Sequence, residues 1–306
     1  MRRTLKWLIV FALVLTSSLA AVQHWRNSLQ RGDREGWWEG SETAKTAREA
    51  PIHAEPVPTW TNHPGMAKDV FTFARVRYTR MDENKVWWKG GYWYSDMPDS
   101  DLNLAYRLQQ LTSLKADPDG RIIDLNDPEL FNYPFIYMVE PGLMTLEDDE
   151  IPALRRYLMS GGFLMADDFW GEPQWANFER EIKRVFPERS FSEVETNHPL
   201  FSVVFPLARP KEQLQVPNVI TGRRSEQTGI TWEFHEGASG MREACRDVHF
   251  RALFDDKGRL MVFACFNTDF GDGWEREGED EYFFRRFAEG ISYPMAINIL
   301  FYVMTH

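Results

Sequence analysis

The feature that most constrains the fold of this chain is an alternation of short, wholly apolar segments with longer amphipathic ones. Residues 135–139 and 163–166 are apolar throughout, which is typical of strands that are buried on both faces. Residues 145–158 and 174–186, which follow them in turn, place apolar side chains at helical spacing. This order of strands and helices predicts an α/β fold, with a mainly parallel sheet covered by helices on both faces.

The rest of the domain extends this pattern. Residues 71–78 alternate like a further strand. Residues 249–254 and 259–266 are joined by a turn that contains Asp and Gly, which predicts an antiparallel hairpin added to the parallel sheet. Residues 187–247 are irregular and are interpreted as an insertion or lid, and a helix over 292–304 is expected to close the domain.

The N-terminal residues predict export from the cytoplasm. Basic residues at positions 2, 3 and 6 precede an unbroken apolar run and then small residues, where a signal peptidase would cleave after Ala20. We expect residues 1–22 to be a signal peptide or, if they are not cleaved, an inner-membrane anchor over residues 7–22. In either case this segment contacts the membrane at least during export, and the rest of the chain is extracytoplasmic, either periplasmic or secreted.

Composition divides the remaining chain into two parts. Residues 23–68 lack apolar periodicity and contain four prolines between positions 51 and 64, which is typical of a flexible stalk. Residues 69–306 are expected to form one α/β domain. The chain carries 46 acidic against 35 basic residues and no basic stripe, which argues against a nucleic-acid partner. Its two cysteines, Cys245 and Cys265, leave a disulfide and two buried thiols equally open.

Acidic side chains gather where three of the predicted strands end. In open α/β sheets, ligands bind at the carboxyl ends of the strands, so we expect these loops to converge on one rim. The candidate ligand-binding residues are Glu140, Asp167, Asp168, Trp170, Asn267, Asp269, Asp272, Trp274 and Glu275.

Two kinds of chemistry suit such a rim. Clustered carboxylates indicate a site for a divalent cation, Ca²⁺ or Mg²⁺, with Asp167, Asp168 and Asp269 as ligands, or a pair of acids with different pKa values. The alternative is that these acids cap helices and satisfy loop amides. Aromatic residues beside the acids are typical of sites that grip sugars, although core packing is the commoner role of such rings.

Searches for a catalytic nucleophile favour a non-catalytic domain. The sequence contains no Gly-x-Ser-x-Gly motif, no His-Glu-x-x-His motif and no glycine-rich phosphate loop. Our first hypothesis is therefore a cell-envelope domain that binds a small-molecule ligand or an envelope protein. The second is a metal-assisted or acid/base hydrolase acting on an envelope sugar or peptide. The third is a structural partner of a membrane complex.

Several long strings of this sequence resemble a bacterial domain family of unknown function, DUF4159. They are Gly-Gly-Phe-Leu-Met-Ala-Asp-Asp-Phe-Trp-Gly over 161–171, His-Pro-Leu-Phe over 198–201, Asn-x-Asp-x-Gly-Asp-Gly-Trp-Glu over 267–275 and Tyr-x-Met-Thr-His over 302–306. The resemblance covers about residues 69–306. It implies a three-layer fold of the Rossmann-like or flavodoxin-like kind, with distant kinship to class I glutamine amidotransferases. Those relatives carry a nucleophilic Cys on a tight turn after a central strand, whereas this chain has Asp167 and Asp168 there, which argues against amidotransferase chemistry.

Overall fold

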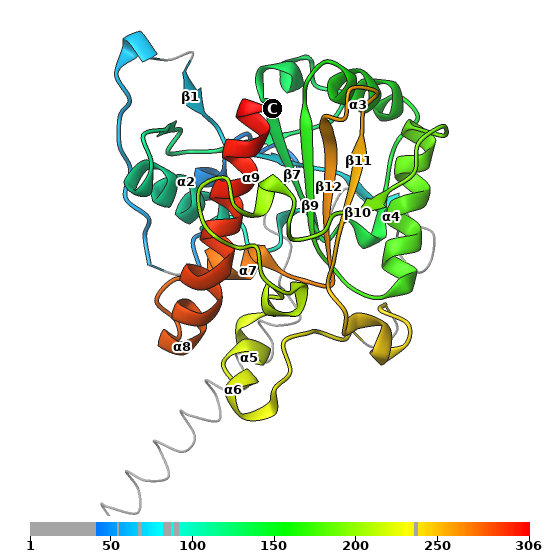
Figure 1. Ribbon diagram of the computed structural model, residues 1–306. Helices are drawn as coiled ribbons and strands as arrows, with labels where there is room; N and C mark the ends of the chain where they lie inside the picture. The colour runs from blue at the N-terminus through cyan, green and yellow to red at the C-terminus, as the bar shows by residue number, and fades with distance from the viewer. Residues whose placement is uncertain (1–40, 54, 67–68, 82–86, 89–91, 236–237) are drawn as a thin grey trace, which may run out of the picture. The chain divides into compact units, whose positions relative to one another are not determined.

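The computed structural model describes residues 41–306 except 54, 67–68, 82–86, 89–91 and 236–237 (Figure 1). The predicted signal or anchor segment over residues 1–22 lies outside the described residues, as does the first part of the predicted stalk.

A seven-stranded sheet forms the centre of the domain, in the order β10-β11-β12-β9-β7-β2-β6. The strands are β2 (Ala74–Val76), β6 (Arg121–Ile123), β7 (Phe135–Val139), β9 (Phe163–Phe169), β10 (Ser192–Glu193), β11 (His249–Phe254) and β12 (Leu260–Phe266). The run from β12 to β6 is parallel, whereas β10, β11 and β12 pair antiparallel. The prediction of a mixed α/β domain with a mostly parallel sheet and an added hairpin is therefore confirmed.

Two small sheets flank the large one. In one of them β1 (Val70–Phe71) pairs parallel with β5 (Lys115–Ala116). In the other β3 (Thr79–Met81) lies between β4 (Trp87–Trp88) and β8 (Met144–Thr145). The alternating segment 71–78 is thus not one strand, because β1 pairs with β5 while β2 joins the large sheet between β6 and β7.

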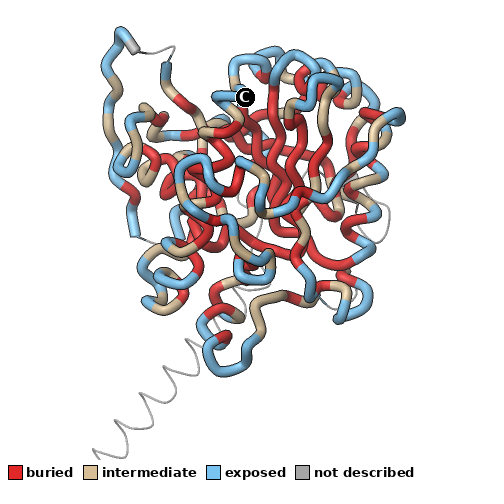
Figure 2. Tube along the Cα trace, viewed as in Figure 1, coloured by how far each residue is buried: buried red, intermediate tan, exposed pale blue. Residues whose placement is uncertain are grey.

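The apolar strands separate two hydrophobic cores. Along β7 the side chains of Phe135, Tyr137 and Val139 enter one core, while Ile136 and Met138 enter the other. Side chains alternate between the faces of a strand, so a strand buried on both faces must be apolar at every position. Figure 2 shows the resulting buried centre beneath an exposed rim.

Helices cover both faces of the sheet. One face is covered by α2 (Asp99–Leu111), α7 (Phe270–Glu275) and the C-terminal helix, and the other by α3 (Glu150–Met159) and α4 (Glu172–Val185). Short helices lie in the loops. They are η1 (Ala47–Glu49), η2 (Pro64–Met66), η3 (Tyr92–Tyr94), η4 (Pro128–Asn132), η5 (Pro141–Leu143), η6 (Pro199–Phe201), η7 (Lys211–Gln213), α5 (Val219–Gly222), α6 (Ser225–Thr228) and η8 (Arg242–Cys245).

The C-terminal helix consists of α8 (Glu281–Phe283), the π-helical η9 (Phe284–Ser292) and α9 (Tyr293–Thr305). A Cβ added at Gly273 of α7 would lie 2.1 Å from Ser292 Oγ, so only glycine allows α7 to pack this closely on η9. Among the described residues, the stretch Glu281–Thr305 is long and apolar enough to cross a membrane by length and composition alone. Most of its apolar window is buried inside the domain, as expected of a core helix.

The described part of the predicted stalk packs on the edge of the large sheet. The amide of Ile122 in the edge strand β6 donates to Lys45 O at 2.8 Å, and Trp60 Nε1 donates to Ala116 O at 2.8 Å. Ala47 and Val57 are buried in one of the two cores. This segment therefore covers the outer edge of β6, which would otherwise present unpaired backbone groups.

Cys245 and Cys265 are both buried free thiols in this structure. Of the two alternatives that the sequence left open, the structure therefore shows the unpaired one.

Candidate functional site

Acidic residues meet at the edge of the sheet where β7, β9 and β12 end. Glu140 directly follows β7, Asp167 and Asp168 lie near the end of β9, and Asp269 lies just beyond β12. The amide of Glu140 donates to Asp167 O at 2.9 Å, and that of Asp168 donates to Thr268 O at 3.1 Å. Figure 1 shows α7 at this edge, with α5 and α6 beyond it. The three loops predicted to converge are thus hydrogen-bonded side by side.

The backbone at this edge adopts a conformation that side chains disfavour. Among the described residues, the non-glycine residues with positive φ are Asp96 (64°), Glu140 (44°), Asp168 (55°) and Asn267 (59°). Glu140, Asp168 and Asn267 lie at or beside the ends of β7, β9 and β12, whereas Asp96 lies in the loop between η3 and α2. Left-handed backbone at residues other than glycine costs free energy and tends to gather at functional sites. These turns direct the side chains away from the path of the strands.

Asp167 accepts hydrogen bonds from the N-terminal amides of α7. It belongs to no group of potential cation ligands among the described residues. Its Oδ2 accepts hydrogen bonds from the Tyr137 hydroxyl at 3.1 Å and from the amides of Phe270 at 3.0 Å and Gly271 at 3.1 Å. Its Oδ1 is buried without a hydrogen-bond partner. Burial raises the pKa of Asp167 to about 7, against the opposing effect of its hydrogen bonds.

Asp168, whose backbone is left-handed, joins the first carboxylate group, which consists of Asp96, Asp168 and Asp269. One oxygen of each residue lies within 4.8 Å of the others. Asp168 Oδ1 accepts a hydrogen bond from Trp170 Nε1 at 2.7 Å, and Asp269 Oδ1 accepts one from the amide of Asp272 at 2.8 Å. These hydrogen bonds hold both carboxylates near the N-terminal end of α7.

The second carboxylate group consists of Asp96, Asp272 and Glu275, and it also fits within 4.8 Å. Asp272 accepts a hydrogen bond from the amide of Val219, which ties α5 to α7. Glu275 Oε2 lies 2.5 Å from Arg276 Nε. Because Asp96 belongs to both groups, we refer to the five residues of the two groups together as the acidic cluster.

Asp96 occupies the centre of the acidic cluster. Its Oδ2 is buried from solvent and has no hydrogen-bond partner among the residues that the structure describes. The carboxylate lies directly over Gly271, where an added Cβ would be 2.2 Å from Oδ2. The glycine therefore makes room for an oxygen that no protein donor satisfies.

The electrostatics of the acidic cluster are unbalanced. Four of its members are held well above their usual pKa range, first by burial and then by neighbouring carboxylates: Asp96, Asp168, Asp269 and Glu275. Burial raises the pKa of Asp272 to about 6, while Arg276 opposes the change. Arg276 is also shared, since it lies 3.7 Å from Asp272 and 3.6 Å from Glu279.

Several residues at this edge were not among the sequence candidates. Asp96 lies far from any strand end, and only folding brings it to the cluster. Glu233 and His235 come from the irregular segment 187–247, with His235 Nε2 3.4 Å from Glu233 Oε2. Glu140 Oε1 accepts a hydrogen bond from Ser95 Oγ at 2.6 Å, and burial raises the pKa of Glu140 to about 7. No local spacing in the sequence identifies Asp96 or Glu233.

Three other predicted site residues are buried supports. The side chains of Trp170 and Trp274 are 1% and 0% exposed, so neither ring presents a surface to a ligand. Asn267 Oδ1 accepts a hydrogen bond from the amide of Gly171, and its Nδ2 donates to two carbonyls of the 187–247 segment. Asn267 thereby joins two strand-end loops to that segment.

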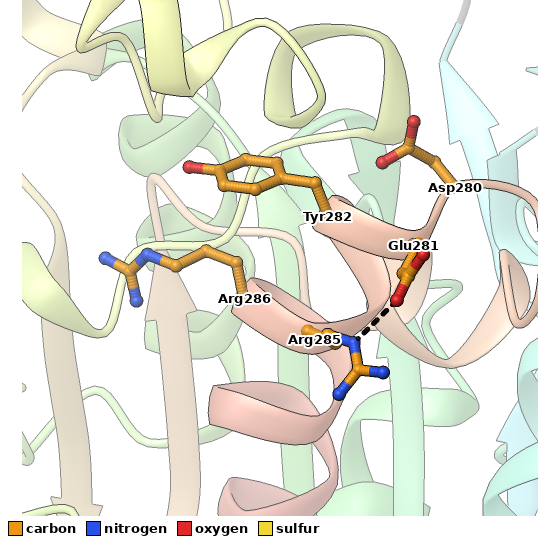
Figure 3. Close-up of a pocket in the computed structure, with 5 residues that line it drawn as sticks. All are labelled: Asp280, Glu281, Tyr282, Arg285 and Arg286. Carbon is orange, nitrogen blue, oxygen red and sulfur yellow. Dashed lines mark hydrogen bonds and ion pairs between the residues drawn. The ribbon is translucent and has the colours of Figure 1, made fainter.

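A shallow hollow of about 570 Å³ lies elsewhere, at the start of the C-terminal helix (Figure 3). Its lining residues are Asp280, Glu281, Tyr282, Arg285 and Arg286. Glu281 and Arg285 pair with each other at 3.0 Å, and no member of the acidic cluster lines this hollow.

The fold and the site together define an α/β domain with buried carboxylates at the carboxyl edge of its sheet. The chain belongs to the family described as domain of unknown function (DUF4159), whose model matches residues 72–304. No curated protein matches the chain. All five residues of the acidic cluster lie within the region that the family model covers.

Proposed function

We propose that this domain binds a divalent cation, Ca²⁺ or Mg²⁺, in the acidic cluster, and that the cation-loaded edge holds a ligand or partner protein at the cell envelope. The observation that carries the proposal is the pair of carboxylate groups that share Asp96, a half-buried residue whose Oδ2 is buried and has no hydrogen-bond partner among the described residues.

Charge balance supports a cation. Unpaired carboxylates are too costly to bury, so they either take up protons or gather around a metal ion. Arg276 contacts two members of the acidic cluster, Asp272 and Glu275, and it is shared with Glu279. Burial and neighbouring carboxylates raise the pKa values of the cluster, so protons compete with a divalent cation for the same oxygens. A divalent cation replaces those protons at neutral pH.

The dimensions and donor atoms favour a hard cation. All the ligand atoms in both groups are carboxylate oxygens, which Ca²⁺ and Mg²⁺ prefer. Ca²⁺ binds oxygen at about 2.3–2.6 Å, so ligands on opposite sides of the ion stand about 5 Å apart. Oxygens that lie within 4.8 Å of one another suit that spacing.

We also assign the domain to the three-layer, Rossmann-like and flavodoxin-like folds. The parallel run from β12 to β6, with helices on both faces, supports this assignment. So does the position of the acidic cluster, because ligands of such folds bind beyond the carboxyl ends of the strands. The sequence resemblance implies that Asp167 and Asp168 stand where amidotransferase relatives carry their Cys, and we propose that an oxygen ligand at the left-handed Asp168 replaces the thiol there.

The proposed location is the cell envelope, either periplasmic or secreted. The basic and then apolar start of the chain supports export, with residues 7–22 as an anchor if they are retained.

A second candidate function is an acid/base hydrolase acting on an envelope sugar or peptide. It is favoured by Glu140, a carboxyl group with a pKa of about 7 beside the Glu233–His235 pair. Burial is the main cause of that pKa, while His235 lowers it and Glu233 raises it. Groups that titrate near neutrality suit general acid–base catalysis.

The cation proposal is tested by thermal unfolding of the full-length chain in EDTA and then in Ca²⁺ or Mg²⁺. A cation at about 100 times its Kd stabilises the folded state by about 2.7 kcal/mol, which raises Tm by several degrees. We expect this shift in the wild type and in Asp148→Asn, whose side chain is fully exposed, but not in Asp168→Asn or Asp269→Asn. Equal shifts in all four proteins, or none in the wild type, would refute the proposal.

A further inference from the structure

We propose that a second type of cation site, formed by His53, Asp99 and Glu275, clamps the N-terminal segment over residues 41–66 to the domain and takes Zn²⁺ or Mn²⁺. This inference rests on the proposed function, because Glu275 is also a ligand in the second carboxylate group.

The three side chains come from three separate parts of the chain. His53 lies in the N-terminal segment, Asp99 opens α2 and Glu275 ends α7. One nitrogen or oxygen of each lies within 4.8 Å of the others. The amide of His53 also donates to Asp99 Oδ2 at 3.0 Å, which holds the imidazole Nδ1 3.7 Å from the same oxygen.

Burial distinguishes this group from an ordinary surface cluster. Asp99 is 0% exposed and Glu275 is 4% exposed, whereas the side chain of His53 is 57% exposed. The two carboxylates therefore form the floor of the site, and the imidazole covers it from the solvent side. Solvent reaches the imidazole, so a cation from solution can exchange at this position.

Glu275 Oε2 supplies the independent sign of a missing ligand. This oxygen is buried and accepts no hydrogen bond within the described part of the chain. Its cationic neighbour, Arg276 Nε, approaches to 2.5 Å without hydrogen-bond geometry and is shared with Asp272 and Glu279. One guanidinium among three carboxylates leaves negative charge that a divalent cation would neutralise.

The donor set selects a different cation from the inner groups. An imidazole nitrogen with two carboxylates suits Zn²⁺ or Mn²⁺ better than Ca²⁺, which prefers oxygen ligands alone. Water completes the coordination at the exposed side. The inner carboxylate groups contain only oxygen donors, so the two kinds of site respond to different ions.

The clamp connects a segment that lies before the matched family region to the family's acidic edge. The family model begins at residue 72, while His53, the Lys45 carbonyl that accepts from Ile122 and the Trp60 side chain that donates to Ala116 all precede it. A cation at this site joins that segment to both α2 and α7. Cation binding there stabilises the docked arrangement of residues 41–66, since the ligands come together only when the segment is docked.

The test is limited trypsin digestion of the full-length chain, with cleavage after Arg48 measured in EDTA, Zn²⁺, Mn²⁺ and Ca²⁺. We expect Zn²⁺ or Mn²⁺ to slow this cleavage at least tenfold in the wild type, because a docked segment resists the protease. His53→Ala should lose the protection, while His63→Ala, at another exposed histidine of the same segment, should keep it. Visible absorption of bound Co²⁺ that is present in the wild type and changed in His53→Ala then assigns the imidazole as a ligand.

The outcomes separate this inference from the proposed function. Protection by Zn²⁺ that persists in Asp269→Asn but not in His53→Ala supports the clamp independently of the first carboxylate group. If His53→Ala and the wild type are protected equally, or neither is protected, the clamp is refuted. Stabilisation by Ca²⁺ that depends on Asp269 would still stand in that case.

Discussion

Replacing the buried Asp167 by Asn is expected to stabilise the domain at alkaline pH. The Asn side chain keeps an oxygen that can accept from the three donors that now contact Oδ2, which are the Tyr137 hydroxyl and the amides of Phe270 and Gly271. The substitution removes the charge and replaces Oδ1, which has no hydrogen-bond partner among the described residues, by an amide NH2 group that does not titrate. Burial makes that charge unfavourable, since it raises the pKa of Asp167 from the usual 3.8 to about 7.

The size of the effect follows from this pKa. Because the pKa is higher in the folded state, the folded protein binds the proton more tightly than the unfolded chain does. The resulting stabilisation is complete below pH 3.8. It is lost as the pH rises to about 7. At 1.36 kcal/mol for each pH unit, the total loss is about 4 kcal/mol. Between pH 5 and pH 8, about 3 kcal/mol of it appears. Asp167→Asn does not lose this stability. Its free energy of unfolding should therefore rise by about 3 kcal/mol relative to the wild type between pH 5 and pH 8.

Urea unfolding in EDTA at a series of pH values measures this difference, with tryptophan fluorescence as the signal. Both proteins carry the same acidic cluster, so its titration cancels in the comparison. Asp148→Asn, at a fully exposed side chain, should follow the wild type at every pH. A constant difference between Asp167→Asn and the wild type, or a change that favours the wild type at pH 8, would refute the reasoning and show that the carboxylate charge stabilises the start of α7.

Two further predictions concern the support and the chemistry of the acidic edge. Arg75 is fully buried and pairs with Asp101 while donating to the carbonyls of Trp93 and Ser95, next to Asp96. Arg75→Ala should cost about 3–5 kcal/mol in chemical unfolding, since it leaves Asp101 as a buried unpaired charge, and a cost below 1 kcal/mol would contradict this account. If the domain is a hydrolase with Glu140 as general base, its rate on glycan or peptide fragments of the envelope should rise with pH through about 7 and be lost in Glu140→Gln. A variant as active as the wild type would remove Glu140 from the chemistry.

Much of the fold could be predicted because local residue patterns carry it. Strand β7 is apolar throughout, and β9 is apolar over residues 163–166. The helices that follow these strands have one apolar face each. The hairpin of β11 and β12 was predicted from two apolar runs around a short polar turn, and the structure confirms it. The segment 71–78 was misread as a single strand, because alternation of side chains does not reveal which neighbours a strand pairs with.

The sequence by itself determined which acids stand at the strand ends, since the carboxyl ends of parallel strands share one edge of a sheet. Only the tertiary structure decided their roles. Asp167 and Asp168 are adjacent in the chain, yet Asp167 accepts hydrogen bonds from the start of α7, while Asp168, in a left-handed turn near the end of β9, belongs to the acidic cluster. Asp96 and His53 complete that edge from distant segments, and their positions depend on long-range packing that no local spacing in the sequence records.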